Sequence, residues 1–156
     1  MTSDPPSDPR APDVVAAQRR DAAVLRGQAR PTAAVTAGGV LGALARWAVG
    51  LAAPTAPGAF PWATLGINVL GSLLMGVVVA LVVERPGAHP LLRPFLGVGV
   101  LGGFTTFSTF AVDAEALLAG GHRTTALLYL VGTAVAAVAA TALGLWLTRR
   151  LAGRAR

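Results

Sequence analysis

Four long apolar runs constrain the fold of this chain more than any other feature of its sequence. They cover residues 33–53, 62–83, 92–118 and 124–147. Each run is close to the roughly 20 residues with which a helix crosses the hydrocarbon core of a membrane. Helices of a soluble bundle carry a polar face, and these runs have almost none. We therefore predict an all-α membrane protein with four transmembrane helices.

The overall composition agrees with a membrane protein and excludes several classes of function. Of the 156 residues, 54% are hydrophobic and 13% are charged, whereas about a quarter of the residues in a soluble domain are charged. The chain contains no cysteine, which excludes disulfides and cysteine-based metal sites. It shows no Ser-His-Asp arrangement, phosphate-binding loop or pair of intramembrane carboxylates. We predict that it is not an enzyme.

The regions outside the apolar runs differ from them in composition. Residues 1–31 combine prolines with mixed charges, and we predict a disordered N-terminal tail there, with a surface helix from Val14 to Leu25 as the alternative. This start does not resemble a signal peptide. Residues 32–148 form the predicted four-helix transmembrane domain, and residues 149–156 form a basic C-terminal tail. The net charge is +6. The arginines lie mostly at the ends of the runs, so we expect contacts with anionic lipid headgroups and no nucleic-acid partner.

The third run contains the most unusual stretch of the sequence, GGFTTFSTF from Gly102 to Phe110. Paired glycines weaken a helix, and hydroxyl side chains compete for its backbone hydrogen bonds. We predict that the third helix is broken near its middle, which at membrane depth indicates a binding site or an ion path. The alternative is a packing seam, because small residues also let helices approach closely.

Two polar residues lie inside the other runs. Arg46 is the only ionisable residue well inside a run, and an arginine at that depth marks a functional site unless it reaches the membrane surface by snorkelling. Asn68 can donate to an anion through its amide, or it can join two helices by a hydrogen bond. Because the runs offer donors and no acidic residue at depth, we predict passage of anions over cations.

Aromatic and hydroxyl residues extend this candidate path. Phe107 and Phe110 share a helix face, and their ring edges could hold a dehydrated anion or pack as plain apolar groups. Tyr129 and Thr133 could form a polar rail, although a tyrosine near a membrane boundary is often an interface anchor. We interpret four ionisable residues at run ends or in loops as solvated: His89, Asp113, Glu115 and His122.

Small residues recur at four-residue spacing, which predicts close contact between helices. The rows are Gly38 with Gly42, Gly99 with Gly103, and Gly132, Ala136, Ala140 and Gly144. The chain is too short to enclose a path for a solute by itself, so we expect an oligomer.

Three motifs together resemble the Fluc (CrcB) family of bacterial fluoride channels. In chain order they are GGVLGALARW from Gly38, TLGINVLGS from Thr64 and GGFTTFSTF from Gly102. The resemblance extends from about Gly38 to Leu147 and leaves the N-terminal tail outside. It implies a multi-pass protein of the bacterial cell membrane, assembled as an antiparallel dimer of four-helix subunits with two fluoride pores.

The resemblance also implies roles for individual residues. Phe107 and Phe110 match the phenylalanines whose ring edges line the pores, Asn68 matches the pore asparagine, and Arg46 matches the arginine of the vestibule. Ser108 and Thr109 lie within the same pore motif.

The same resemblance implies a polar track and a structural ion. Tyr129 and Thr133 match positions along the track, and Ala137 stands where a further hydroxyl is expected. The resemblance implies a structural sodium ion, which is not transported and which main-chain carbonyls at the break in the third helix would hold. Gly102 and Thr105 match the positions that bind it.

The implied function is the passive export of cytoplasmic fluoride, which relieves fluoride toxicity. The main alternative is a subunit of a proton-coupled small-multidrug-type antiporter. Such coupling needs a titratable group at depth, and we expect the runs to offer only Arg46. A membrane assembly subunit that transports nothing is the second alternative.

The arginines also predict an orientation. With four spans, the N-terminal tail, the 84–93 loop and the C-terminal tail share one side and hold eleven arginines, whereas the opposite side holds only Arg123. This excess places both termini in the cytoplasm. A chain with one fixed orientation cannot form an antiparallel homodimer in the cell. Heterodimerisation with a related subunit of opposite orientation is therefore the alternative to a homodimer.

Overall fold

The structure, a computed structural model, describes residues 11–84 and 87–153 of the chain. Within these ranges it contains helices and turns and no strand. Four helical segments are long and apolar enough to cross a membrane, namely Gly27–Ala52, Trp62–Val83, Arg93–Ala119 and Arg123–Ala152. The prediction of an all-α membrane protein with four spans is confirmed, and the predicted ends of the last three spans lie within about five residues of those observed.

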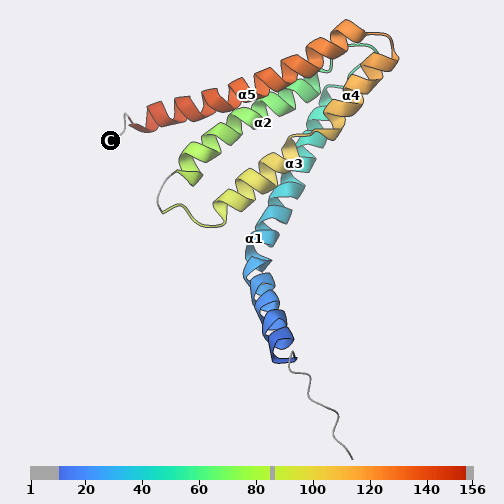
Figure 1. Ribbon diagram of the computed structural model, residues 1–156. Coiled ribbons are helices and arrows are strands. Elements are labelled where there is room, and N and C mark those ends of the chain that lie inside the picture. Colours follow the sequence, from blue (N-terminus) through green and yellow to red (C-terminus); the bar gives the residue numbers. More distant parts are fainter. Residues whose placement is uncertain (1–10, 85–86, 154–156) are drawn as a thin grey trace, which may run out of the picture.

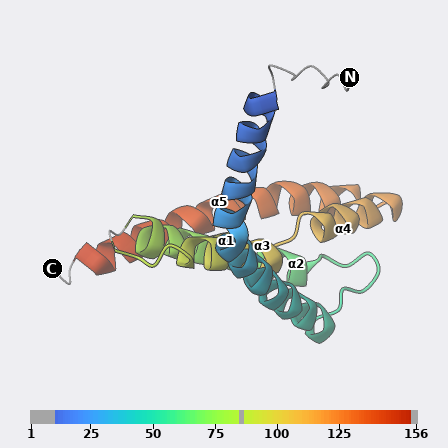
Figure 2. The ribbon, with the colours of Figure 1, turned by 90° about the horizontal axis from the view of Figure 1, so that it is seen from below.

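The first helix, α1 (Ala11–Ala52), begins well before the predicted start of the transmembrane domain. It contains Pro31 and carries residues that the composition assigned to a disordered tail. A proline inside a helix removes one hydrogen bond, yet its fixed φ remains compatible with the helix, and the alanine-rich sequence on both sides favours it. Figures 1 and 2 show this extension projecting away from the other helices. The predicted tail residues 1–10 lie outside the described part of the chain.

The remaining spans are divided into shorter elements. The second span consists of α2 (Trp62–Val78) followed by the π-helical turn η1 (Val79–Val83). The third consists of the π-helix η2 (Arg93–Leu101), the short α3 (Gly102–Phe104) and α4 (Ser108–Ala119). The fourth is α5 (Arg123–Gly153), which continues into the predicted C-terminal tail.

The spans pack in two pairs, and the third span contacts both of them. Helix α2 lies along α5, and α1 crosses η2 and α3 (Figures 1 and 2). Helix α4 then diverges from α1 and packs against α5. The place where α3 ends and α4 begins therefore lies between the two pairs.

The contact between α1 and the third span is made by glycines on both sides. A Cβ added at Gly42 would collide with the carbonyl oxygen of Val100, and one at Gly99 would lie 2.8 Å from the carbonyl oxygen of Val35. Because backbones touch directly here, the predicted rows Gly38 with Gly42 and Gly99 with Gly103 form a closed packing seam.

The third predicted row of small residues is only partly correct. Gly144 and Ala140 face α2, and a Cβ at Gly144 would collide with the carbonyl oxygen of Leu73. Gly132, however, is exposed and has nothing within 4 Å of the place where a Cβ would lie. Positions four apart rotate by about 40° per step around a helix. A strict four-residue row therefore leaves the contact face after a few steps.

Contacts at the two ends of the bundle agree with a four-span topology. At one end, Arg149 Nε donates to Glu84 Oε2 over 2.9 Å, which joins the loop after η1 to the last helix. At the other end, Gly58 lies against the ring of His122, which joins the loop after α1 to the turn before α5. The 84–93 loop and the C-terminal helix thus share one side (Figure 1).

Candidate functional site

The helical path of the third span is interrupted between α3 and α4. Thr105 has φ −72° and ψ 157°, which is an extended conformation, and residues 105–107 are not helical. The side chain of Asn68 on α2 holds this segment by two hydrogen bonds. Its Oδ1 accepts from the Thr106 amide over 2.9 Å, and its Nδ2 donates to the Thr106 carbonyl over 3.0 Å. Asn68 therefore joins two spans, and one of its two N–H groups is already used.

Two backbone amides at the interruption donate to side-chain oxygens instead of to the carbonyls that they would bond in a continuous helix. The Thr106 amide would have bonded to the carbonyl of Gly102, and it bonds to Asn68 instead. The Thr109 amide would have bonded to the carbonyl of Thr105, and it donates to Thr106 Oγ1 over 3.1 Å. The carbonyls of Gly102 and Thr105 are thereby released from helical hydrogen bonding.

The hydroxyl of Thr106 also organises the start of α4. By accepting from the Thr109 amide it acts as a helix cap. The same oxygen lies 3.2 Å from Ser108 Oγ and donates to Thr109 Oγ1 over 3.1 Å. The serine and threonine predicted as pore residues thus belong to one hydroxyl cluster around a buried threonine.

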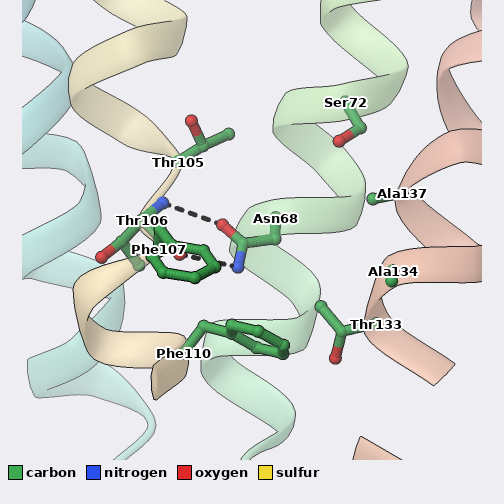
Figure 3. A pocket seen from close by; sticks show the side chains of 9 residues that line it. All are labelled: Asn68, Ser72, Thr105, Thr106, Phe107, Phe110, Thr133, Ala134 and Ala137. Atoms are coloured by element: carbon green, nitrogen blue, oxygen red, sulfur yellow. Dashed lines mark hydrogen bonds between the residues drawn. The ribbon is translucent and has the colours of Figure 1, made fainter. Parts of the chain in front are cut away.

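A cavity of about 350 Å³ opens beside this interruption, between α2, α5 and the third span. Figure 3 shows the side chains that surround it, with Asn68 near the middle. The nine lining residues are Asn68, Ser72, Thr105, Thr106, Phe107, Phe110, Thr133, Ala134 and Ala137. Four of the eight predicted pore residues lie in this wall: Asn68, Phe107, Phe110 and Thr133.

The two predicted phenylalanines form one end of an aromatic group. Their ring centroids lie 5.8 Å apart with an interplanar angle of 47°, and the ring of Phe110 lies 5.1 Å from that of Tyr129. Phe110 is partly buried, whereas Phe107 is 79% exposed in the single subunit. Tilted rings present positively polarised edges as well as faces, so this wall of the cavity is not purely apolar in its electrostatics.

Thr133 is the one buried side chain in the described residues whose polar atom has no hydrogen-bond partner. Thr133 is 4% exposed, and it lines the cavity. An unsatisfied buried hydroxyl costs about 1–3 kcal/mol, and such a group in a native protein commonly marks a place for a ligand or a water molecule. A hydroxyl there can donate to an anion.

Arg46 and Thr109 lie in a second cavity, of about 210 Å³, between α1 and α2. Arg46 is partly buried, and its Nε donates to the Gly103 carbonyl over 3.1 Å. The side chain therefore contacts the protein at the glycine pair instead of only extending toward the membrane surface. Thr106 lines both cavities. The cationic group and the first cavity thus lie on either side of the same short segment.

The structure decides between the interpretations of Tyr129 and corrects that of Asp113. Tyr129 is 0% exposed and lies in the core of the bundle, so it is not an interface anchor. Asp113 was expected to be solvated, and this was wrong. It is partly buried inside the third span and accepts from Thr64 Oγ1 over 2.6 Å and from the Tyr129 hydroxyl over 3.3 Å. Its sequence position, six residues or about 9 Å before the end of the span, hid these partners, because they come from two other helices.

The other three residues of that group, His89, Glu115 and His122, are exposed, as expected. Two residues of the first cavity were not singled out from the sequence. The sequence indicated no role for Thr106 beyond its place in the motif. In the structure its backbone bonds to Asn68 at the interruption, and its side chain caps α4. Ser72 lines the cavity one turn beyond Asn68. The four-residue spacing from Asn68 to Ser72 was the available signal, since it places both side chains on one face of α2.

Comparison with known proteins agrees with this arrangement. Residues 33–145 match the family described as CrcB-like protein, Camphor Resistance (CrcB). The chain is 49% identical over 126 residues to fluoride-specific ion channel FluC 1 of Streptomyces coelicolor, covering 81% of this chain and 82% of that protein. It is 50% identical over 117 residues to FluC 2 of Streptomyces avermitilis, covering 75% and 73% of the two chains.

A second relative from Streptomyces avermitilis, fluoride-specific ion channel FluC 3, is 46% identical over 122 residues, covering 78% of this chain and 60% of that protein. The four spans and these bacterial relatives identify a multi-pass membrane protein. The family match covers the second and third spans, most of the first and fourth, and both cavities. The chain therefore belongs to the CrcB family.

Proposed function

We propose that this chain is a subunit of a fluoride-specific ion channel that lets cytoplasmic fluoride leave the cell passively. The observation that carries the proposal is the cavity beside the α3–α4 interruption, where phenylalanine edges, an asparagine and a buried unpartnered hydroxyl meet inside the membrane domain. Relatives of about 50% identity that are named fluoride-specific channels support the same function.

The chemistry of the cavity suits a small anion that has lost its water. Fluoride is a strong hydrogen-bond acceptor, so a protein must replace its hydration shell with donors. The free hydroxyl of Thr133 and the second N–H of Asn68 are donors, and the edges of Phe107 and Phe110 carry partial positive charge. An inside-negative potential drives an anion outward with about 2.3 kcal/mol per charge per 100 mV, so no coupled ion is needed.

The functional unit in this proposal is an antiparallel dimer. Phe107 is 79% exposed beside a cavity that is lined by polar groups. Polar groups that face lipid are costly in a membrane, and a second subunit would cover them. The large apolar side chains that are exposed in the single subunit, among them Trp47, Val135 and Val138, would then divide between this contact and lipid.

A partner inserted the other way up is required for an antiparallel dimer. The eleven-to-one distribution of arginines favours a single orientation with both termini in the cytoplasm. Relatives named FluC 2 and FluC 3 occur in one organism, so a related subunit of opposite orientation is a reasonable partner. A cysteine introduced at Ala119 and labelled from each side of the cell membrane tests this. Equal labelling from both sides, with full fluoride export by cells that express this chain without a related subunit, would rule out the heterodimer.

A structural sodium ion at the dimer axis is the second component of the proposal. The carbonyls of Gly102 and Thr105 are released from helical bonding because the Thr106 and Thr109 amides donate instead to the Asn68 and Thr106 side chains. Carbonyl oxygens are suitable ligands for a hard monovalent cation. We expect Thr105→Ala to retain sodium-dependent assembly, since the side chain is not a ligand. Assembly and flux that are equal in sodium-free and sodium-containing buffers would contradict the ion's structural role.

The antiporter alternative is weaker than the channel. Asp113 adds a carboxylate to the third span beyond what the sequence suggested, but one of its oxygens already accepts from Thr64 and Tyr129. Asp113 lines a separate cavity of about 270 Å³ under the loop of residues 55–61, and it lines neither of the two cavities described above. A proton-coupled site needs a titratable group that the substrate also reaches. The relatives reported above are named as channels.

The test is ion efflux from liposomes that contain the purified chain. Reconstitution from detergent brings subunits of both orientations together, so a topology bias in the cell does not prevent assembly. We expect rapid fluoride efflux, little chloride efflux and no dependence on a proton gradient. Fluoride release that requires a proton gradient would indicate an antiporter, and no release of either anion would indicate a subunit that does not transport.

A further inference from the structure

The wall of the first cavity has two levels that are one helical turn apart. Asn68 and Ser72 lie four residues apart on α2, and Thr133 and Ala137 lie four apart on α5, so each helix contributes one side chain to each level. Asn68 and Thr133 form the level next to Phe110. Ser72 and Ala137 form the second level (Figure 3). This level is nearer the Glu84–Arg149 end of the bundle, because both α2 and α5 run toward that end.

Beyond the second level the groove between α2 and α5 closes. A Cβ at Gly76 would collide with the carbonyl oxygen of Thr141 and lie 2.6 Å from the amide of Leu145. The backbones of the two helices touch there, as they do at Gly144 and Leu73. An ion that moves along the groove from Phe110 therefore meets Ser72 at the last open level of this subunit.

The hydroxyl groups on these helices differ in whether they already donate a hydrogen bond to a carbonyl of their own helix. Thr141 donates to the Ala137 carbonyl over 3.0 Å, Thr148 to the Gly144 carbonyl over 2.7 Å, and Thr105 to the Leu101 carbonyl over 2.8 Å. Thr133 is buried and has no partner. Within the described part of the chain, Ser72 makes no bond of this kind to its own helix, although it faces the same cavity.

We propose that Ser72 and Thr133 form an anion subsite across the groove between α2 and α5, one level beyond the phenylalanines. In this subsite Ser72 supplies from α2 the hydroxyl donor that α5 does not supply at Ala137. An anion that leaves the ring edges of Phe110 passes from the Thr133 hydroxyl to the Ser72 hydroxyl before it leaves the cavity. The inference rests on the proposed function, since it concerns the same cavity and the same ion.

The test compares fluoride efflux from liposomes for the parent chain and for Ser72→Ala. A hydrogen bond to a charged group is stronger than one between neutral groups, and its loss should slow efflux by about tenfold or more. The matched control is Thr141→Val, which removes a hydroxyl that already donates to its own helix. We expect Thr141→Val to conduct within about twofold of the parent, because the partly buried Thr141 hydroxyl bonds to its own helix and does not line the cavity.

The double variant Ser72→Ala/Ala137→Ser distinguishes donation from packing. It moves the hydroxyl to the opposite wall of the same level, and we expect it to regain most of the lost efflux. If Ser72→Ala does not yield folded protein, Ser72→Cys replaces it, because a thiol is a weak donor of similar size. Parent-like efflux from the folded single variant, or no recovery in the double variant, would overturn the subsite. A parent chain that releases no fluoride would instead refute the proposed function.

Discussion

Two contacts between helices use the same small residues and reach opposite outcomes. Where α1 crosses the third span, glycines on both helices bring the backbones into direct contact. Where α2 meets α5, glycines close the groove only near one end, and alanine, serine and threonine line a cavity of about 350 Å³ at the other. The first contact is stable because nothing can enter it. The second leaves room and hydrogen-bond donors for a ligand.

The difference shows that spacing of small residues does not distinguish a seam from a path. In the seam, every glycine has backbone on its far side, and no hydroxyl group is involved. In the groove, hydroxyls and an amide replace glycines at the lining positions, and one of the hydroxyls, that of Thr133, has no partner. A row of small residues becomes a candidate path when polar groups along it lack partners.

The largest effect should come from filling the closed seam. Gly42→Ala places a methyl group against the Val100 carbonyl, and overpacking of this kind costs about 1–3 kcal/mol. Gly50→Ala on the same helix is the control, because nothing lies within 4 Å of its added methyl. Alanine is the better helix former, so the control should be neutral or stabilising. Thermal unfolding in detergent measures both, and equal stability of the two variants would contradict a closed seam.

An intermediate effect should come from the clamp on Thr106. Asn68→Ala removes both bonds to the Thr106 backbone, which is buried, and leaves its amide and carbonyl unpaired. We expect a loss of about 1–3 kcal/mol in unfolding free energy together with loss of fluoride efflux.

Ser72 lines the same cavity but does not hold the backbone. The Ser72→Ala variant should therefore lower efflux and leave the unfolding temperature unchanged. These two variants separate the loss of the backbone clamp from the loss of a hydroxyl donor alone. A parent-like unfolding temperature for Asn68→Ala would show that the clamp contributes nothing to stability.

The smallest effect should come from the exposed pair at the end of the bundle. A hydrogen bond from the Arg149 guanidinium lowers the pKa of Glu84 below its ordinary value of 4.5. Because the folded pKa is the lower one, the stability from this pair is present above the ordinary pKa and is lost as the pH falls through the folded pKa. The Glu84→Gln variant should therefore match the parent at low pH and be slightly less stable near neutrality. A difference between them that grows below pH 4.5 would contradict the pairing.

The architecture was predictable because membrane-spanning helices have a strong local signal. Runs near twenty apolar residues define spans without any knowledge of tertiary contacts, and three of the four spans end close to the predicted residues. The start of α1 was not predictable in the same way, since a proline and mixed charges suggest disorder even where a helix continues through them.

The candidate site was predictable in its residue types and not in its partners. Glycine pairs and hydroxyls indicated an unusual backbone between Gly102 and Phe110, and the structure has non-helical residues there. The roles of Asp113 and Ser72, in contrast, depend on which residues of other helices face them. A single sequence carries no direct information on such contacts.

The most direct test of the account is fluoride efflux through the Phe110→Ile variant. Isoleucine keeps an apolar side chain at the cavity wall and removes the aromatic ring, so it has no positively polarised edge for an anion. Phe95→Ile is the control, because Phe95 lies in η2 and lines neither cavity. If fluoride passes the rings beside the α3–α4 interruption, Phe110→Ile should elute like the parent on size-exclusion chromatography and release no fluoride, while Phe95→Ile should conduct. Parent-like efflux from a folded Phe110→Ile protein would contradict the account.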